Sequence, residues 1–226
     1  MSPDLDQKLT MLPWLIGALI MSSCVHEAGH AWVAWRLGDR RPDIEAKKTP
    51  FTFRHISFWF TILVPSLLFL YAGIMLGGAK PVMVRTAIGA PKMGLVALAG
   101  PVGNVFFAAI SVAVVVGLQH AGVLTTYYAG DPQYRGALYA VALSVILACL
   151  NLIPLPPFDG SRIVAVFLPE PLRRLYYRLT WPVLIAFVLF TLLSATAAPD
   201  WLMRFNQQVL HDVHAVVMAV HDWIEA

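Results

Sequence analysis

The chain has 226 residues, of which 58% are hydrophobic and only 13% are charged, and its mean hydropathy is +0.69. This composition lies well outside the range of soluble globular domains and predicts an integral membrane protein, with the lipid bilayer as its surroundings. The formal net charge of +3 is small and reflects basic loops, so it gives no reason to expect a nucleic-acid partner.

Five apolar stretches reach the roughly 20 residues that an α-helix needs to cross a hydrocarbon core of about 30 Å. They cover residues 11–35, 58–78, 94–118, 136–155 and 179–198. They fill most of the chain and leave no room for an extramembrane domain of ordinary size. The sequence therefore predicts an all-α polytopic membrane protein with four to five spans, organised as one domain over residues 1–198.

The first stretch contains the motif HEAGH at residues 26–30. On a helix, the spacing of four residues places His26 and His30 on one face, where neutral imidazoles can bind Zn²⁺. The adjacent Glu27 can then accept a proton from a metal-activated water. Ionisable residues inside an apolar span are costly and indicate a functional site. The plain alternative is a His-Glu hydrogen-bonded pair at a helix contact.

The second stretch, residues 58–78, has Pro65 in its middle and three glycines towards its end. If all five stretches cross the membrane, the 16 basic residues divide evenly between the two sides and indicate no orientation. If residues 58–78 enter and return, thirteen of the 16 lie on one side, which the positive-inside tendency makes cytoplasmic. We therefore predict a re-entrant segment near 58–78, with the metal site towards the cytoplasmic side.

Two segments beside this stretch, residues 49–57 and 81–86, alternate between apolar and polar residues. Such alternation is typical of short β segments, and a free strand edge could pair with an unwound substrate. Ordinary loop packing explains the alternation equally well. His55, in the first segment, is expected to be a polar loop residue and not a ligand.

The third stretch carries ALAGPVGN at residues 97–104. Small residues such as Gly100 let helices approach closely, and Asn104 can form a hydrogen bond across the contact. The main role expected for this cluster is packing.

The fourth stretch ends in NLIPLPPFDG, residues 151–160, where three prolines break the helix and Gly160 permits a tight turn. Unwound backbone at membrane depth is tolerated where it lines a wet cavity. A catalytic zinc needs a third protein ligand, and Asp159 is the candidate, although a helix-ending turn residue is the plain alternative. Asn151 could donate its amide to a carbonyl oxygen as negative charge develops there, or could form an interhelical hydrogen bond.

The tail after Pro199 places apolar residues at helical spacing over residues 201–224, which predicts a C-terminal amphipathic helix within 199–226. Its shortage of basic residues favours a position against the protein or the membrane interface. His211, His214 and His221 could mark a second metal site, but exposed helical histidines commonly have no such role.

The chain resembles the site-2 protease family of intramembrane zinc proteases in three motifs, which occur in the order HEAGH, ALAGPVGN and NLIPLPPFDG. Two further motifs, which are RLGD at 36–39 and GGAKPV at 77–82, are similar to those of a compact bacterial-type subgroup without accessory domains. The resemblance implies cleavage of transmembrane protein or peptide substrates in a bacterial inner (plasma) membrane. It also implies one zinc per chain and a set of site residues. These are His26, His30 and Asp159 as zinc ligands, Glu27 as general base and Asn151 as a residue that positions substrate.

The loop at 40–57 and the tail after residue 200 depart from the family pattern, so substrate choice and oligomeric state are not implied. Two other classes of protein could use part of the motif. A metal transporter would need polar residues continuing across the membrane, and the outer halves of these stretches have almost none. A catalytically inactive scaffold would not need Glu27.

Overall fold

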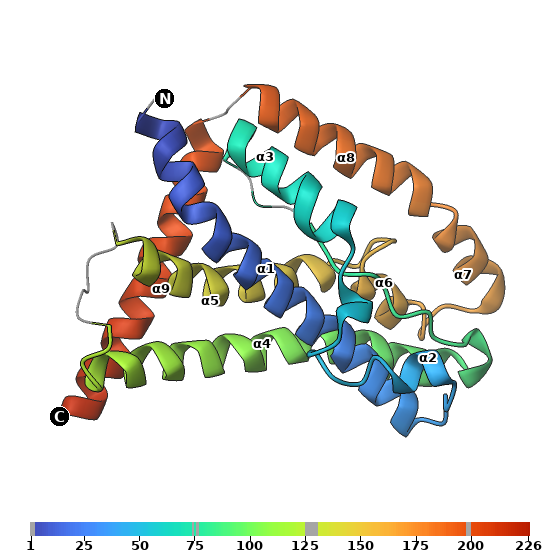
Figure 1. The fold of residues 1–226 in the computed structure, drawn as a ribbon. Helices are drawn as coiled ribbons and strands as arrows, with labels where there is room; N and C mark the ends of the chain where they lie inside the picture. The colour runs from blue at the N-terminus through green and yellow to red at the C-terminus, as the bar shows by residue number, and fades with distance from the viewer. Residues whose placement is uncertain (1–2, 74, 76, 125–130, 198–199) are drawn as a thin grey trace.

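The computed structural model describes residues 3–73, 75, 77–124, 131–197 and 200–226. Within these residues all regular structure is helical. Three long helices form the centre of the protein: α1 (Pro3–Arg36), α4 (Ala90–His120) and α5 (Pro132–Asn151). Each packs against the other two (Figure 1). Their apolar residues show little preference for one face, as expected for helices surrounded by hydrocarbon and protein.

In the described part of the chain, three helices are long and apolar enough to cross a membrane, fewer than the four to five predicted. They are Leu5–Arg36, Ala90–His120 and Tyr134–Asn151. The last predicted stretch, 179–198, does form a helix, α8 (Thr180–Ala197), but residues 198 and 199 lie outside the described residues. A span at α8 therefore stays a prediction.

The predicted re-entrant segment folds back on itself. A π-helical turn, Phe58–Leu63, leads into α3 (Val64–Ala72), and the apolar helix Phe58–Tyr71 rises only about 21 Å, short of a hydrocarbon core of about 30 Å. The chain then returns beside its start, because the Gly78 amide donates to the Phe60 carbonyl at 3.1 Å and Thr61 Oγ1 donates to the Gly78 carbonyl at 2.6 Å. This path is that of a hairpin, while its depth in a membrane stays a prediction.

The predicted β segments at 49–57 and 81–86 are not formed. The first contains a 3₁₀ turn at Phe53–His55, and residues 81–85 form no regular structure. In residues 81–86 the alternation reflects one-sided burial, since Val82 is 5% exposed and Met83 is 72% exposed, whereas the apolar Phe51 and Phe53 of the first segment are both exposed. The amides that a strand would use are bonded elsewhere: Val82 N to a side chain of α1, and Arg85 N to Asp39.

Four further helices complete the fold. The short helices α2 (Pro42–Glu45), α6 (Asp159–Val164) and α7 (Glu170–Tyr177) lie at one end of the bundle. The predicted amphipathic tail forms α9 (Asp200–Glu225), which crosses the opposite end beside α4 and α5 (Figure 1). Leu210 and Val217 of α9 are buried in the same cluster as Leu15 and Tyr134. The predicted domain boundary at 198/199 falls outside the described residues and stays a prediction.

Candidate metal centre

The two histidines of HEAGH lie in the last third of α1, one helical turn apart. Both are buried, with 7% of His26 and 4% of His30 exposed. Their Nε2 atoms lie 3.1 Å apart and their rings meet edge to face, with centroids 4.6 Å apart. The predicted alignment of the two imidazoles on one helix face is therefore what the structure shows.

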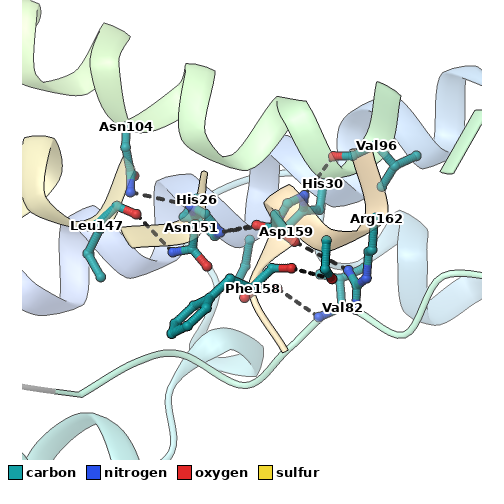
Figure 2. Close-up of polar contacts among 12 residues, drawn as sticks. His26, His30, Val82, Val96, Asn104, Leu147, Asn151, Phe158, Asp159 and Arg162 are labelled. Carbon is teal, nitrogen blue, oxygen red and sulfur yellow. Dashed lines mark hydrogen bonds and ion pairs between the residues drawn. The ribbon is translucent and has the colours of Figure 1, made fainter. Parts of the chain in front are cut away.

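Asp159 reaches these histidines from the first residue of α6. Its Oδ2 atom lies 3.0 Å from Nε2 of His26 and 3.0 Å from Nε2 of His30 (Figure 2). The loop that follows α5 brings the carboxylate there, and its tight course depends on Gly160. A Cβ on Gly160 would lie 2.3 Å from the Leu152 carbonyl oxygen.

The spacing of these three atoms fits a tetrahedral metal ion. Zinc bonds to nitrogen and oxygen of about 2.0–2.1 Å place neighbouring tetrahedral ligands about 3.3 Å apart. The observed separations are 3.0, 3.0 and 3.1 Å. Two neutral imidazoles and one carboxylate also form a donor set that zinc prefers. The residues present therefore fit this metal.

Glu27 offers a second carboxylate close by. One of its oxygens and the ligand nitrogens of His26 and His30 lie within 4.8 Å of one another, so these three side chains could also hold a metal. We favour Asp159 as the third ligand for two reasons. Asp159 is closer to both nitrogens, and Glu27 Oε2 already accepts a hydrogen bond from the Val82 amide at 2.7 Å.

Hydrogen bonds around the ligands fix their orientation. Nδ1 of His30 faces the Val96 carbonyl of α4 at 2.7 Å, so this nitrogen carries the proton and Nε2 keeps its lone pair for a metal. Nη1 of Arg162 donates to the second oxygen of Asp159, Oδ1, at 3.4 Å. Nδ1 of His26 lies 3.3 Å from the amide nitrogen of Asn104.

Close approach of α1 and α4 makes these contacts possible. A Cβ on Gly100 would lie 2.5 Å from Cε1 and Nε2 of His30 and 2.7 Å from Cε1 of His26. On the facing helix, a Cβ on Gly29 would lie 2.6 Å from the Ala99 carbonyl oxygen. The cluster at 97–104 does pack, as predicted, but what it packs against is the imidazole pair itself.

Residues 82–85, whose Val82 amide binds Glu27, are tied to the rest of the protein by Asp39. This carboxylate accepts hydrogen bonds from Arg41 at 2.8 and 2.7 Å and from the Arg85 amide at 3.1 Å. Arg41 also donates to the Met83 carbonyl at 2.6 Å. The hydrogen bond from Arg41 is the main cause that lowers the pKa of Asp39 to about 2, so the carboxylate stays charged at neutral pH.

A cavity of about 900 Å³ opens beside the candidate ligands, and His26 is part of its lining. It lies between α1, the hairpin formed by 58–81, the end of α5 and α8, and its wall is largely apolar. Glu27 and Asn151 both line it. Phe187 of α8 closes one side and meets Phe158 edge to face, with ring centroids 5.6 Å apart.

Asn151, like Glu27, forms no hydrogen bond with His26, His30 or Asp159 among the described residues. Its Nδ2 atom donates to the Leu147 carbonyl of its own helix at 2.9 Å (Figure 2). An amide nitrogen has two donor hydrogens, so one remains for a group inside the cavity. His55 is buried and its Nε2 lies 3.1 Å from the Thr49 carbonyl, in agreement with its predicted role in a loop.

Sequence reasoning missed several contacts of the site. The Val82 amide and the Val96 carbonyl are backbone groups, and no residue type signals them. Arg162 could have been found from its position three residues after Asp159, one turn along a helix. Asn104 lies four residues after Gly100, the same spacing as the two histidines on the facing helix. Among the described residues, the histidines of α9 form no second metal cluster.

Comparison with known proteins gives three relatives of the same kind. The chain is 31% identical over 201 residues to the candidate zinc metalloprotease YwhC of Bacillus subtilis, covering 86% of each chain. It is 29% identical over 180 residues to the candidate zinc metalloprotease Rip2 of Mycolicibacterium smegmatis, covering 77% of this chain and 65% of the relative. For Rip2 of Mycobacterium tuberculosis the identity is 29% over 166 residues, covering 71% of this chain and 60% of the relative. No protein-family profile and no solved structure match the chain.

Proposed function

The chain belongs to the site-2 protease family, and on that premise we propose that it is an intramembrane zinc metalloprotease. It hydrolyses peptide bonds within or near transmembrane segments of membrane-protein substrates. The observation that carries the proposal is the convergence of His26, His30 and Asp159 at 3.0–3.1 Å, with Glu27 beside them at the wall of an apolar cavity.

One zinc ion per chain would be held by His26, His30 and Asp159. When bound, zinc supplies the Lewis acidity that makes water a nucleophile at neutral pH. Val96 and Arg162 keep two of the ligands in place, His30 through its Nδ1 proton and Asp159 through its Oδ1 atom. These partners maintain the ligand geometry while substrate enters and leaves.

Glu27 is the general base. It accepts the proton of the attacking water and passes it to the leaving amine, as a carboxylate next to the reacting atoms can do. The Val82 amide bonds one carboxylate oxygen, Oε2, and this leaves the other free for the proton. The single hydrogen bond also restricts rotation of the carboxylate, so that its position is set before substrate binds.

Asn151 steadies the scissile carbonyl through its remaining amide hydrogen. Negative charge develops on that oxygen as water attacks, and a donor placed in advance stabilises it. The helical hydrogen bond to Leu147 holds the side chain for this task.

The cavity suits a substrate that arrives from the bilayer. Its apolar wall accommodates the side chains of a transmembrane segment, and its volume of about 900 Å³ exceeds that of a single side chain many times. The substrate must unwind locally, because the peptide bonds of an intact helix are shielded by its own side chains and hydrogen bonds.

The enzyme lies in a bacterial inner membrane with its site towards the cytoplasm. Thirteen of the 16 basic residues fall in the segments 36–54, 79–92 and 160–178, which include α2, α6 and α7. Helices α2, α6 and α7 share one end of the bundle, whereas α9 lies at the other end (Figure 1). The candidate ligands belong to the first of these ends, because His26 and His30 lie in the last third of α1 and Asp159 begins α6. The positive-inside tendency makes the basic end cytoplasmic.

The test compares wild type with Glu27→Gln, using purified protein and a transmembrane peptide substrate. We expect both to bind one zinc per chain, and we expect the variant to cleave about 10²–10⁴-fold more slowly, the usual contribution of a general base. Glu225→Gln, an exposed glutamate on α9, is the matched control and should cleave at the wild-type rate. Equal cleavage by Glu27→Gln and wild type would refute the assigned mechanism.

A further inference from the structure

Asn104 of α4 contacts His26 on the edge of the ring that faces away from Asp159. The side chain is fully buried, and its Nδ2 atom lies 3.3 Å from Nδ1 of His26 (Figure 2). Its other polar atom, Oδ1, is also buried and has no hydrogen-bond partner among the described residues. A buried polar atom without a partner lowers stability, so a packing role alone does not explain an amide here.

The two histidines differ in the partner of their Nδ1 atoms. An imidazole that binds a metal through Nε2 carries its proton on Nδ1 and donates it to an acceptor. His30 meets this requirement through the Val96 carbonyl, which can only accept. His26 has the Asn104 amide instead, and an amide can either donate or accept.

The direction of the amide decides the tautomer of His26. If Nδ2 donates to Nδ1, the proton of His26 lies on Nε2, where it is donated to Asp159 Oδ2 at 3.0 Å. If the amide turns by 180°, Oδ1 accepts the proton of Nδ1 and the lone pair of Nε2 becomes free for a metal. This rotation of the amide preserves the shape of the Asn104 side chain, so α4 need not move. After the rotation, Nδ2 lacks a partner in place of Oδ1.

We propose that Asn104 is a positioning residue that sets the tautomer of His26: its Oδ1 atom accepts the proton of Nδ1, so that Nε2 keeps its lone pair for a metal. The inference rests on the proposed function, because it concerns the same zinc site. A carboxylate at this position would accept the same proton, whereas an apolar side chain would not.

The experiment measures zinc dissociation constants by chelator competition on the purified full chain in detergent. Asn104→Leu, which is close in size but has no polar atom, should bind zinc about 10–100-fold more weakly, the usual effect of losing a ligand's hydrogen-bond partner. Asn104→Asp should bind zinc as tightly as wild type or more tightly, because its carboxylate accepts from Nδ1. The absorption spectrum of the cobalt-loaded Asp variant should match that of cobalt-loaded wild type.

Gln119→Leu is the matched control, since it also replaces a buried amide on α4, at a distance of about 22 Å along the helix. Its zinc affinity should equal that of wild type. Thermal unfolding shows whether each variant is folded, and Asn104→Ala replaces the Leu variant if the latter fails to fold.

Two results would overturn the role of Asn104. One is wild-type zinc affinity in Asn104→Leu, which would leave the residue a packing role. The other is a folded Asn104→Asp variant that loses zinc as strongly as Asn104→Leu, which would mean that the site needs a donor. A wild-type protein that binds no zinc would instead overturn the proposed function and this inference with it.

Discussion

Gly100→Ala should disrupt the metal site by adding a single methyl group. The added Cβ would lie 2.5 Å from Cε1 and Nε2 of His30 and 2.7 Å from Cε1 of His26. Carbon atoms in contact are ordinarily about 3.5–4.0 Å apart, so rings or helices must separate by about 1 Å. The rings cannot yield freely, because His30 is bonded to the Val96 carbonyl and His26 contacts Asn104.

A displacement of about 1 Å exceeds the roughly 0.5 Å within which catalytic groups must be held. We expect cleavage to fall about 10²-fold and the free energy of unfolding to fall by about 1–3 kcal/mol, the usual cost of overpacking a core. Substrate cleavage, zinc content and chemical denaturation in one detergent measure these effects.

Gly117→Ala is the control for this prediction, since it makes the same change on the same helix. A Cβ there has no neighbour within 4 Å, and an alanine inside a helix is more stable than a glycine by roughly 0.5–1 kcal/mol. The control should therefore be as active as wild type and slightly more stable. If Gly100→Ala behaved like Gly117→Ala, the close packing of α4 on the imidazoles would not constrain the site as we describe.

Four further predictions concern the surroundings of the site. Asp39 has a pKa of about 2, below its usual 3.8, so its contribution to stability is complete above pH 3.8 and is lost as the pH falls towards 2. Asp39→Asn should remove this part of the pH dependence of unfolding, and an unchanged profile would contradict the role of the Arg41 contact. Arg162→Gln should weaken zinc binding about tenfold in chelator competition, whereas Arg174→Gln on exposed α7 should not. Gly29→Ala should lower the free energy of unfolding by about 1–3 kcal/mol because its Cβ would lie 2.6 Å from a carbonyl oxygen of α4, while Gly17→Ala on the same helix meets open space and should not. In a Cys149→Ser background, a membrane-impermeant thiol reagent should label Arg85→Cys from the cytoplasmic side and Arg204→Cys from the other, and labelling of residue 85 only from outside would refute the re-entrant topology.

The candidate ligands could be picked out from the sequence because their signal does not depend on tertiary structure. A spacing of four residues aligns His26 and His30 on any helix, and an acid such as Asp159 is conspicuous beside long apolar sequence. Apart from Arg162, the partners of the site residues carry no comparable signal. Every residue has a carbonyl, and every residue except proline has an amide. Only the approach of α4 and of residues 79–85 selects the Val96 carbonyl and the Val82 amide as partners.

The strand prediction at 81–86 was wrong because alternation reports which side chains are buried and not where the amides are bonded. Val82 is buried and Met83 is exposed, as happens in a surface segment whether or not it pairs as a strand. Here the amides of Val82 and Arg85 bond to Glu27 and Asp39, and this choice depends on acids 55 and 46 residues away in the chain. The contact of Asn104 with His26 was likewise not predictable, because the helix-packing motif around Asn104 does not indicate which side chain it meets.

Glu27, the proposed base, is anchored by a main-chain amide, and this has a consequence for how such an enzyme can diversify. Any residue except proline presents the amide that Val82 offers to Glu27, within the size that its burial permits. Its neighbours Ala79, Lys80 and Pro81 line the cavity. Mutation can therefore change the side chains that meet a substrate while the amide that anchors Glu27 stays in place. New cleavage preferences can then arise, in evolution or in the laboratory, without changes to the proposed catalytic residues.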